Sequence, residues 1–187
     1  MTVSKEAMRS TAAKAAALAA ILMASATDDH QDDAAKRIAL GFIKRRELYR
    51  ALPYDDGFGN QTIGYGHLIK KTETITGPLT PDEALTLLSN DFEAHRKAVD
   101  RVPGAAALKP QQLAALYSFA FNVGPASIET SGIAKAIEEG QLKRVPKIML
   151  QYVKATDRKT KQKLVVKGLV ARRAAEIELW NSTETLK

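Results

Sequence analysis

The sequence contains no cysteine, so the chain can form no disulfide bond and offers neither a thiolate nucleophile nor a cysteine-ligated metal. Only three histidines occur, His30, His67 and His95, and their wide separation does not fit a zinc site. We therefore expect no metal centre. Long hydrophobic runs are missing as well, because the apolar run over residues 15–23 is shorter than the roughly 20 residues that a bilayer-spanning helix needs.

Nucleic-acid-binding motifs are also lacking, although the chain is basic. Its net charge is +7 and its pI is about 9.6, which favours polyanionic partners. The sequence shows no basic helix with interleaved aromatic residues, no zinc-finger spacing and no aromatic RNA-binding motif. We therefore expect no nucleic acid among the partners, and the charge leaves other polyanionic surfaces as candidates.

The remaining composition suits one folded domain. A hydrophobic content of 45% over 187 residues is enough for one compact core, and no internal repeat or second domain is visible. We expect this domain to cover residues 34–180. An acidic linker over residues 27–33 would precede it, and a polar tail over residues 181–187 would follow.

The first 26 residues stand apart from this domain. A basic segment precedes the apolar run 15–23, and the small-x-small sequence Ala24-Ser25-Ala26 follows it. This order is typical of a secretory signal peptide. A weakly hydrophobic, alanine-rich segment could also act as a membrane anchor that is later released, or form a helix that packs on the domain. We favour export, by either of the first two routes.

The residues with the clearest chemical meaning lie between positions 38 and 68. Leu40, Ile43 and Glu47 occupy one stripe of an amphipathic helix, so we expect Glu47 to be partly buried. Burial disfavours the charged form of a carboxyl group. Glu47 could therefore keep a proton near neutral pH, as a general acid must.

A second carboxylate and a hydroxyl follow in a glycine-rich region. Asp56 lies in a polar turn, where water and backbone N–H groups would keep it ionised, and Thr62 lies in the first strand of a hairpin. Two carboxylates in opposed environments form the pair that glycosidic bond cleavage requires. Simpler interpretations exist for each residue alone: a surface ion pair for Glu47 and ordinary turn chemistry for Asp56.

Asp56 lies nine positions after Glu47, and Thr62 lies six positions after Asp56. This spacing resembles the signature of the phage T4-type lysozymes, the endolysin family of glycoside hydrolases. The shared residues also include Tyr54, Gly59 and the run Thr62-Ile63-Gly64-Tyr65-Gly66-His67. The resemblance implies that Glu47 is the catalytic acid and that Asp56 and Thr62 position the attacking water. It also implies that Leu68 binds substrate and that Tyr65 and His67 support the site.

One position departs from the family pattern. The family usually has glycine directly after the catalytic glutamate, whereas this chain has Leu48. Because glycine would end the helix, Leu48 predicts that the helix continues toward Pro53, which cannot lie in a helix interior.

Helices are expected through the rest of the chain. Thr80-Pro81-Asp82-Glu83 has the pattern of a capping box and predicts a long helix to about Asp100. Pro110 opens a helix that is apolar nearly all round, as a core helix should be. Shorter helices are predicted over residues 131–139 and 146–153, and a basic loop over residues 157–163.

Two later sequence segments, residues 115–124 and 168–180, also resemble the family. The first implies that Phe121 and Asn122 lie on the substrate side. The second implies that Arg172 or Arg173 pairs with Glu47; the sequence leaves the choice open.

The resemblance runs from about Ala34 to Trp180. It implies an α+β, lysozyme-like fold, with a small β-hairpin lobe, a larger helical lobe and the active-site cleft between them. The implied activity is hydrolysis of the β-1,4 bond between N-acetylmuramic acid and N-acetylglucosamine in peptidoglycan, with inversion and without a cofactor, by a monomer.

Two alternatives to this activity stay open. A lytic transglycosylase would need an acid but no activated water, so Asp56 and Thr62 argue against it. A non-catalytic wall-binding or virion structural module of the same fold is the other, and Leu48 is the only residue in its favour.

The expected partners and location follow from the same features. The partners are peptidoglycan glycan strands, the anionic envelope and, through residues 1–26, transiently the inner membrane. The expected location is the periplasm or cell wall of a bacterial host, with a membrane tether before release; association with a virion is the alternative.

Overall fold

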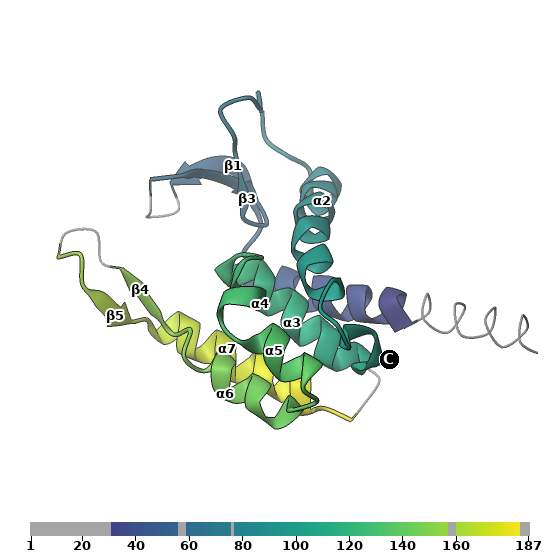
Figure 1. Cartoon of the computed structure of the whole chain (residues 1–187). Coiled ribbons are helices and arrows are strands. Elements are labelled where there is room, and N and C mark those ends of the chain that lie inside the picture. The colour runs from purple at the N-terminus through teal and green to yellow at the C-terminus, as the bar shows by residue number, and fades with distance from the viewer. Residues whose placement is uncertain (1–30, 56–58, 76, 157–159, 184–187) are drawn as a thin grey trace, which may run out of the picture.

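The computed structural model describes residues 31–55, 59–75, 77–156 and 160–183. A small antiparallel sheet lies apart from a larger group of helices, and the long helix α2 (Pro81–Asp100) connects them (Figure 1). The α+β architecture and the division into a small β lobe and a helical lobe are as predicted. Residues 1–26 and Asp56 lie outside the described residues, so the predictions for them stay predictions.

A helix over residues 31–46 is the first described element. Its buried face consists of residues spaced three or four apart, namely Ala35, Ala39, Phe42 and Ile43. The helix already includes residues 31–33, which the sequence placed in an acidic linker. The predicted continuation toward Pro53 is wrong, because the helix ends at residue 46 and Glu47 follows in a bend.

The residues after Glu47 form a strand instead of more helix. β1 (Arg50–Asp55) pairs antiparallel with β2 (Gln61–Gly64), which pairs with β3 (His67–Leu68). The predicted hairpin is therefore β2–β3, and β1 adds a third strand at the sheet edge. Proline is tolerated on an edge strand or at an irregular pairing, and the β1–β2 register shifts between Arg50 and Tyr54, on either side of Pro53.

The two long helices that the sequence predicted are confirmed. Thr80 caps α2, where its hydroxyl accepts from the Glu83 N–H while the Glu83 carboxylate accepts from the Thr80 N–H. α3 (Pro110–Val123) is buried on nearly every side, between α2 and α7 (Lys167–Asn181). It forms the centre of the helical lobe.

Short elements complete this lobe. They are the 3₁₀ helices η1 (Ala105–Ala107) and η2 (Leu142–Arg144) and the helices α4 (Ser127–Thr130), α5 (Ile133–Glu138) and α6 (Val145–Met149). α4 was not predicted, and α5 begins later than expected because Gly132, with φ 85°, precedes it in a left-handed conformation. None of the helices within the described residues is long and apolar enough to span a membrane.

A hairpin that the sequence did not reveal lies next to the predicted basic loop over residues 157–163, of which residues 157–159 lie outside the described part of the chain. β4 (Lys154–Thr156) pairs antiparallel with β5 (Lys163–Val165), and β5 leads directly into α7. The strands are only three residues long and mix lysine with apolar residues, so they carry little periodic signal.

Candidate active site

Glu47 lies between the two lobes. Its Oε1 accepts a hydrogen bond from Arg172 Nη1 on α7 at 2.6 Å. Its Oε2 faces Gly66 in the β2–β3 turn, where a Cβ would lie 3.7 Å from that oxygen. Gly66 has φ +89°, a conformation that favours glycine. The Glu47 side chain is 27% exposed, so the predicted partial burial is confirmed.

A buried ionic network holds Arg172 in place. Arg172 Nε donates to Glu176 Oε1 at 3.2 Å, one helical turn further along α7. Glu176 is fully buried and accepts from the Ser118 hydroxyl of α3 at 2.7 Å. Arg173, also fully buried, contacts both oxygens of Glu176 through Nη2 at 3.0 Å and Nε at 2.7 Å.

The two arginines therefore have different partners. Arg172 pairs with Glu47, whereas Arg173 pairs with Glu176 and donates to Asn122 Oδ1 at 2.8 Å. Desolvation by burial lowers the pKa of Arg173, although the Glu176 carboxylate opposes that shift. The choice that the sequence left open is thus decided by the structure in favour of Arg172.

Thr62 lies in a row of side chains that crosses the small sheet. Tyr54 on β1 is opposite Thr62 on β2, which is opposite Leu68 on β3. Thr62 is 6% exposed, whereas Leu68 is half-exposed. Asp56 directly follows the end of β1 and lies outside the described residues.

Tyr65 and His67 link the small lobe to its surroundings. The buried ring of Tyr65 lies 5.6 Å from the Tyr49 ring, centroid to centroid. His67 is buried and has a carboxylate at each ring nitrogen: Asp91 Oδ2 of α2 lies 2.7 Å from Nδ1, and Glu73 Oε2 lies 3.0 Å from Nε2. These two contacts fix the orientation of the imidazole ring between the small sheet and α2.

Phe121 and Asn122 occupy different surroundings from Glu47. The Phe121 ring packs on the His95 ring of α2, with centroids 5.2 Å apart, and Asn122 is bonded to Arg173. The structure thus connects Asn122 to the network behind Glu47 and does not bring Phe121 to it. Their assignment to the substrate side stays a prediction.

Sequence reasoning missed the residues that form hydrogen bonds and ion pairs with the predicted site residues. Ser118, Glu176, Asp91 and Glu73 were not singled out, although Glu176 stands four positions after Arg172, the spacing of an ion pair on one helix. Within the described residues, no group of three or more histidines, aspartates and glutamates is placed to hold a metal ion.

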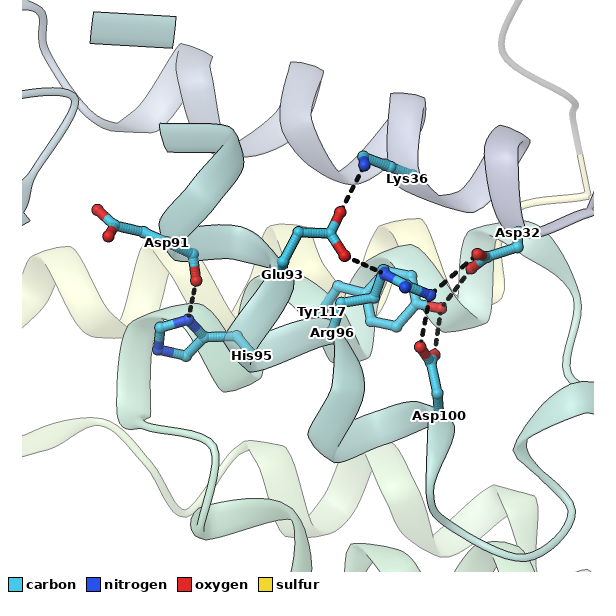
Figure 2. Close-up of polar contacts among 8 residues, drawn as sticks. All are labelled: Asp32, Lys36, Asp91, Glu93, His95, Arg96, Asp100 and Tyr117. Atoms are coloured by element: carbon cyan, nitrogen blue, oxygen red, sulfur yellow. Dashed lines mark hydrogen bonds and ion pairs between the residues drawn. The ribbon is translucent and has the colours of Figure 1, made fainter. Parts of the chain in front are cut away.

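A second ionic network fixes the opposite end of the 31–46 helix (Figure 2). Arg96 Nη1 of α2 lies 2.9 Å from Asp32 Oδ2 and 2.6 Å from Asp100 Oδ2. The Tyr117 hydroxyl is within hydrogen-bond distance of both aspartates, at 3.2 Å from Asp32 Oδ1 and 2.7 Å from Asp100 Oδ1. Desolvation by burial raises the pKa of Asp100.

A small sheet set against a helical lobe, with a glutamate held between them by an arginine, defines a lysozyme-like protein of the class that lyses peptidoglycan. Comparisons with known proteins agree. The sequence model of the phage lysozyme family matches residues 44–176, and this chain belongs to that family. It is thus a lysozyme, a glycoside hydrolase of the endolysin type.

Individual relatives support the assignment. The chain is 30% identical over 136 residues to the SAR-endolysin of Escherichia phage Mu, covering 70% of this chain and 71% of that protein. Its fold is similar to that of the endolysin from Escherichia coli O157:H7 phage FAHEc1, with a TM-score of 0.69, 26% identity and coverage of 81% and 95%. It is also similar to the muramidase domain of SpmX from Asticaccaulis excentricus, with a TM-score of 0.66, 28% identity and coverage of 78% and 96%.

Proposed function

We propose that Glu47 is the general acid in hydrolysis of the β-1,4 bond between N-acetylmuramic acid and N-acetylglucosamine. The observation that carries the proposal is that the two Glu47 oxygens have different surroundings. Arg172 binds Oε1, while Oε2 faces the β2–β3 turn of the other lobe. One oxygen is therefore fixed, and the other is available to protonate the leaving oxygen of the glycan.

Arg172 would act twice in this reaction. Before proton transfer it orients the carboxyl group, since its own guanidinium is anchored by buried Glu176. After the transfer it stabilises the new carboxylate, because the guanidinium then faces an opposite charge instead of a neutral carboxyl group.

Asp56 and Thr62 would position the water that attacks the opposite face of the sugar. Inversion at the anomeric carbon requires room for that water, so we expect the Glu47 and Asp56 carboxyl groups to lie roughly 6.5 to 9.5 Å apart. The low exposure of Thr62, between Tyr54 and Leu68, supports a fixed hydroxyl at this point of the sheet. Leu68 itself would contact the glycan strand.

Glu47→Gln tests the acid assignment. We expect the rate of wall lysis to fall by about 10²- to 10⁴-fold, because an amide cannot donate the proton. Turbidity of permeabilised cells measures the rate, and urea unfolding checks that the variant is folded. The matched control is Glu138→Gln at an exposed glutamate of α5. An undiminished lytic rate for Glu47→Gln would refute the assignment.

Product analysis tests the reaction type. A hydrolase that inverts releases reducing sugars of α configuration, which NMR detects early in the reaction. Products with 1,6-anhydro sugars would instead assign the protein to the lytic transglycosylases.

We also propose that residues 1–26 deliver the enzyme, as a monomer, across the inner membrane and tether it there before release. The basic segment, short apolar run and small residues of this stretch support the proposal, as does the similarity to a SAR-endolysin. N-terminal sequencing of material from membrane and periplasmic fractions tests it. An intact N-terminus in both fractions supports a releasable anchor, whereas a start near residue 27 indicates a cleaved signal peptide.

A further inference from the structure

The β4–β5 hairpin is a two-stranded ribbon that projects from the helical lobe (Figure 1). Its register pairs Ala155 with Leu164 and Lys154 with Val165, and the Val166 N–H donates to the Val153 carbonyl at 2.9 Å. A hairpin of two strands is marginally stable unless a further surface covers it.

The two faces of the ribbon differ in polarity. Residues opposite one another share a face, and successive pairs alternate between faces. One face therefore carries only apolar side chains, those of Val153, Ala155, Leu164 and Val166. The other face carries Lys154, Thr156, Lys163 and Val165. Leu164 is 49% exposed and Val166 is 38% exposed, whereas Val153 and Ala155 are half-buried, so the β5 side of the apolar face is open to solvent.

The ribbon also lies in a strongly basic stretch of the chain. The described residues between positions 147 and 167 include five lysines and no acidic residue. Within the described residues, Lys154, Lys161, Lys163 and Lys167 form no ion pair with a carboxylate. Their charge is available to a partner.

We propose that the β4–β5 hairpin docks on the surface of an anionic phospholipid bilayer. Lysines would contact the lipid phosphates, and Leu164 and Val166 would enter the boundary between headgroups and acyl chains. Lys154 and Lys163 lie on the opposite face, and their long side chains can extend past the edges of the ribbon to the phosphates. A purely polar polyanion would satisfy the lysines but leave the apolar face in water.

This docking is independent of the catalytic roles proposed above, and it would hold the enzyme at the membrane next to its wall substrate. β5 leads directly into α7, which carries Arg172. Arg172 and Glu47 would then stay close to the bilayer while the enzyme works.

The absence of cysteine allows a direct test in the full chain. A single Leu164→Cys substitution, labelled with a polarity-sensitive fluorophore, reports on the ribbon even if the N-terminal segment also binds the bilayer. Leu52→Cys, at an exposed leucine of the small sheet, is the matched control. The probes used are vesicles of phosphatidylcholine, vesicles containing phosphatidylglycerol, and purified peptidoglycan.

We expect a blue shift of the label at position 164 with phosphatidylglycerol vesicles only, and none at position 52. Lys154→Gln with Lys163→Gln should weaken the response about fivefold per lysine. Lys71→Gln with Lys143→Gln, at two exposed lysines elsewhere, should leave it unchanged. Glu47→Gln should also leave it unchanged, so that failure of the catalytic proposal is distinguishable. No shift with anionic vesicles, an equal shift with neutral vesicles, or a shift with peptidoglycan alone would overturn the proposal.

Discussion

The 31–46 helix is held at its two ends by ionic networks of similar composition that leave their carboxylates in different states. At the first end, all four oxygens of Asp32 and Asp100 have a partner in Arg96 or Tyr117. At the other end, Arg172 binds Glu47 Oε1, and among the described residues no donor is hydrogen-bonded to Oε2. A fully paired carboxylate anchors structure, whereas a half-paired one remains available for chemistry.

Helix α3 supports both networks through consecutive residues. Tyr117 bonds the aspartates of the first network, and Ser118 bonds Glu176 of the second. Successive side chains on a helix point about 100° apart, so one buried helix can serve both sites. Both networks are thus supported by the same buried helix. They differ in how many oxygens of their carboxylates are hydrogen-bonded.

The largest effect is expected for Glu176→Gln. Loss of this charge leaves Arg172 and Arg173 without their buried carboxylate, and breaking such a network typically costs about 3 to 5 kcal/mol. We expect the free energy of unfolding to fall by that amount and the lytic rate to fall with it. Urea unfolding measures the first. Glu178→Gln, at an exposed position of the same helix, should change neither.

Arg172→Lys should separate activity from stability. A lysine ammonium cannot reproduce the planar guanidinium that bonds Glu176 through Nε and Glu47 through Nη1. Because a misplaced catalytic group costs on the order of 10²-fold in rate, we expect a loss of that size. The loss of stability should be smaller than for Glu176→Gln. Equal lytic rates for Arg172→Lys and the parent protein would show that Glu47 needs no such orientation.

Asp32→Asn removes an ion pair at the other end of the 31–46 helix. Asp32 is partly exposed, so its ion pair with Arg96 should contribute only about 1 kcal/mol. We expect a slightly lower midpoint in urea and an unchanged lytic rate. A loss of activity as large as that of Arg172→Lys would contradict the division into a structural and a chemical end.

The smallest effects are expected in the pH dependence of the free energy of unfolding, to which the first network contributes. The raised pKa of Asp100 means that the folded protein takes up this proton at a higher pH than the unfolded chain does. Asp100 therefore adds stability as the pH falls from its folded pKa toward the ordinary aspartate value. Asp100→Asn should accordingly show its largest deficit against the parent protein in acid.

Glu93 should behave in the opposite sense. Its hydrogen bond with Lys36 lowers its pKa, so its contribution is present above the ordinary glutamate value and is lost as the pH falls through the folded pKa. The deficit of Glu93→Gln should thus be largest near neutral pH and vanish in acid. Urea unfolding across the acid range measures both trends, and parallel trends for the two variants would refute the assignment of these shifts.

The parts of the fold that the sequence predicted are those with strong local signals. The capping box at Thr80 fixes the start of α2, and the continuous apolar character after Pro110 identifies α3 as central. The spacing from Glu47 to Thr62 led to the family and so to the site. Each of these signals lies within a short, continuous segment of the sequence.

The parts that sequence reasoning missed depend on contacts between distant residues. Arg172 is 125 residues from Glu47, and Ser118 is 58 residues from Glu176, so no local pattern joins them. The first residues of β1 were mistaken for helix because Leu48 lacks the helix-ending character of glycine, whereas pairing with β2 decides the conformation of the strand. β4 and β5 are too short to show an alternating pattern.

The position of Gly66 over Glu47 gives the two lobes unequal influence on this carboxyl group. A swing of the small sheet away from the helices would open the space above Oε2 to water while leaving Oε1 bonded to Arg172. A return of the sheet would remove that hydration from one oxygen only. In the proposed role of Glu47 as proton donor, the hydration of Oε2 would thus depend on the position of the small sheet, whereas the orientation of the carboxyl group would depend on Arg172.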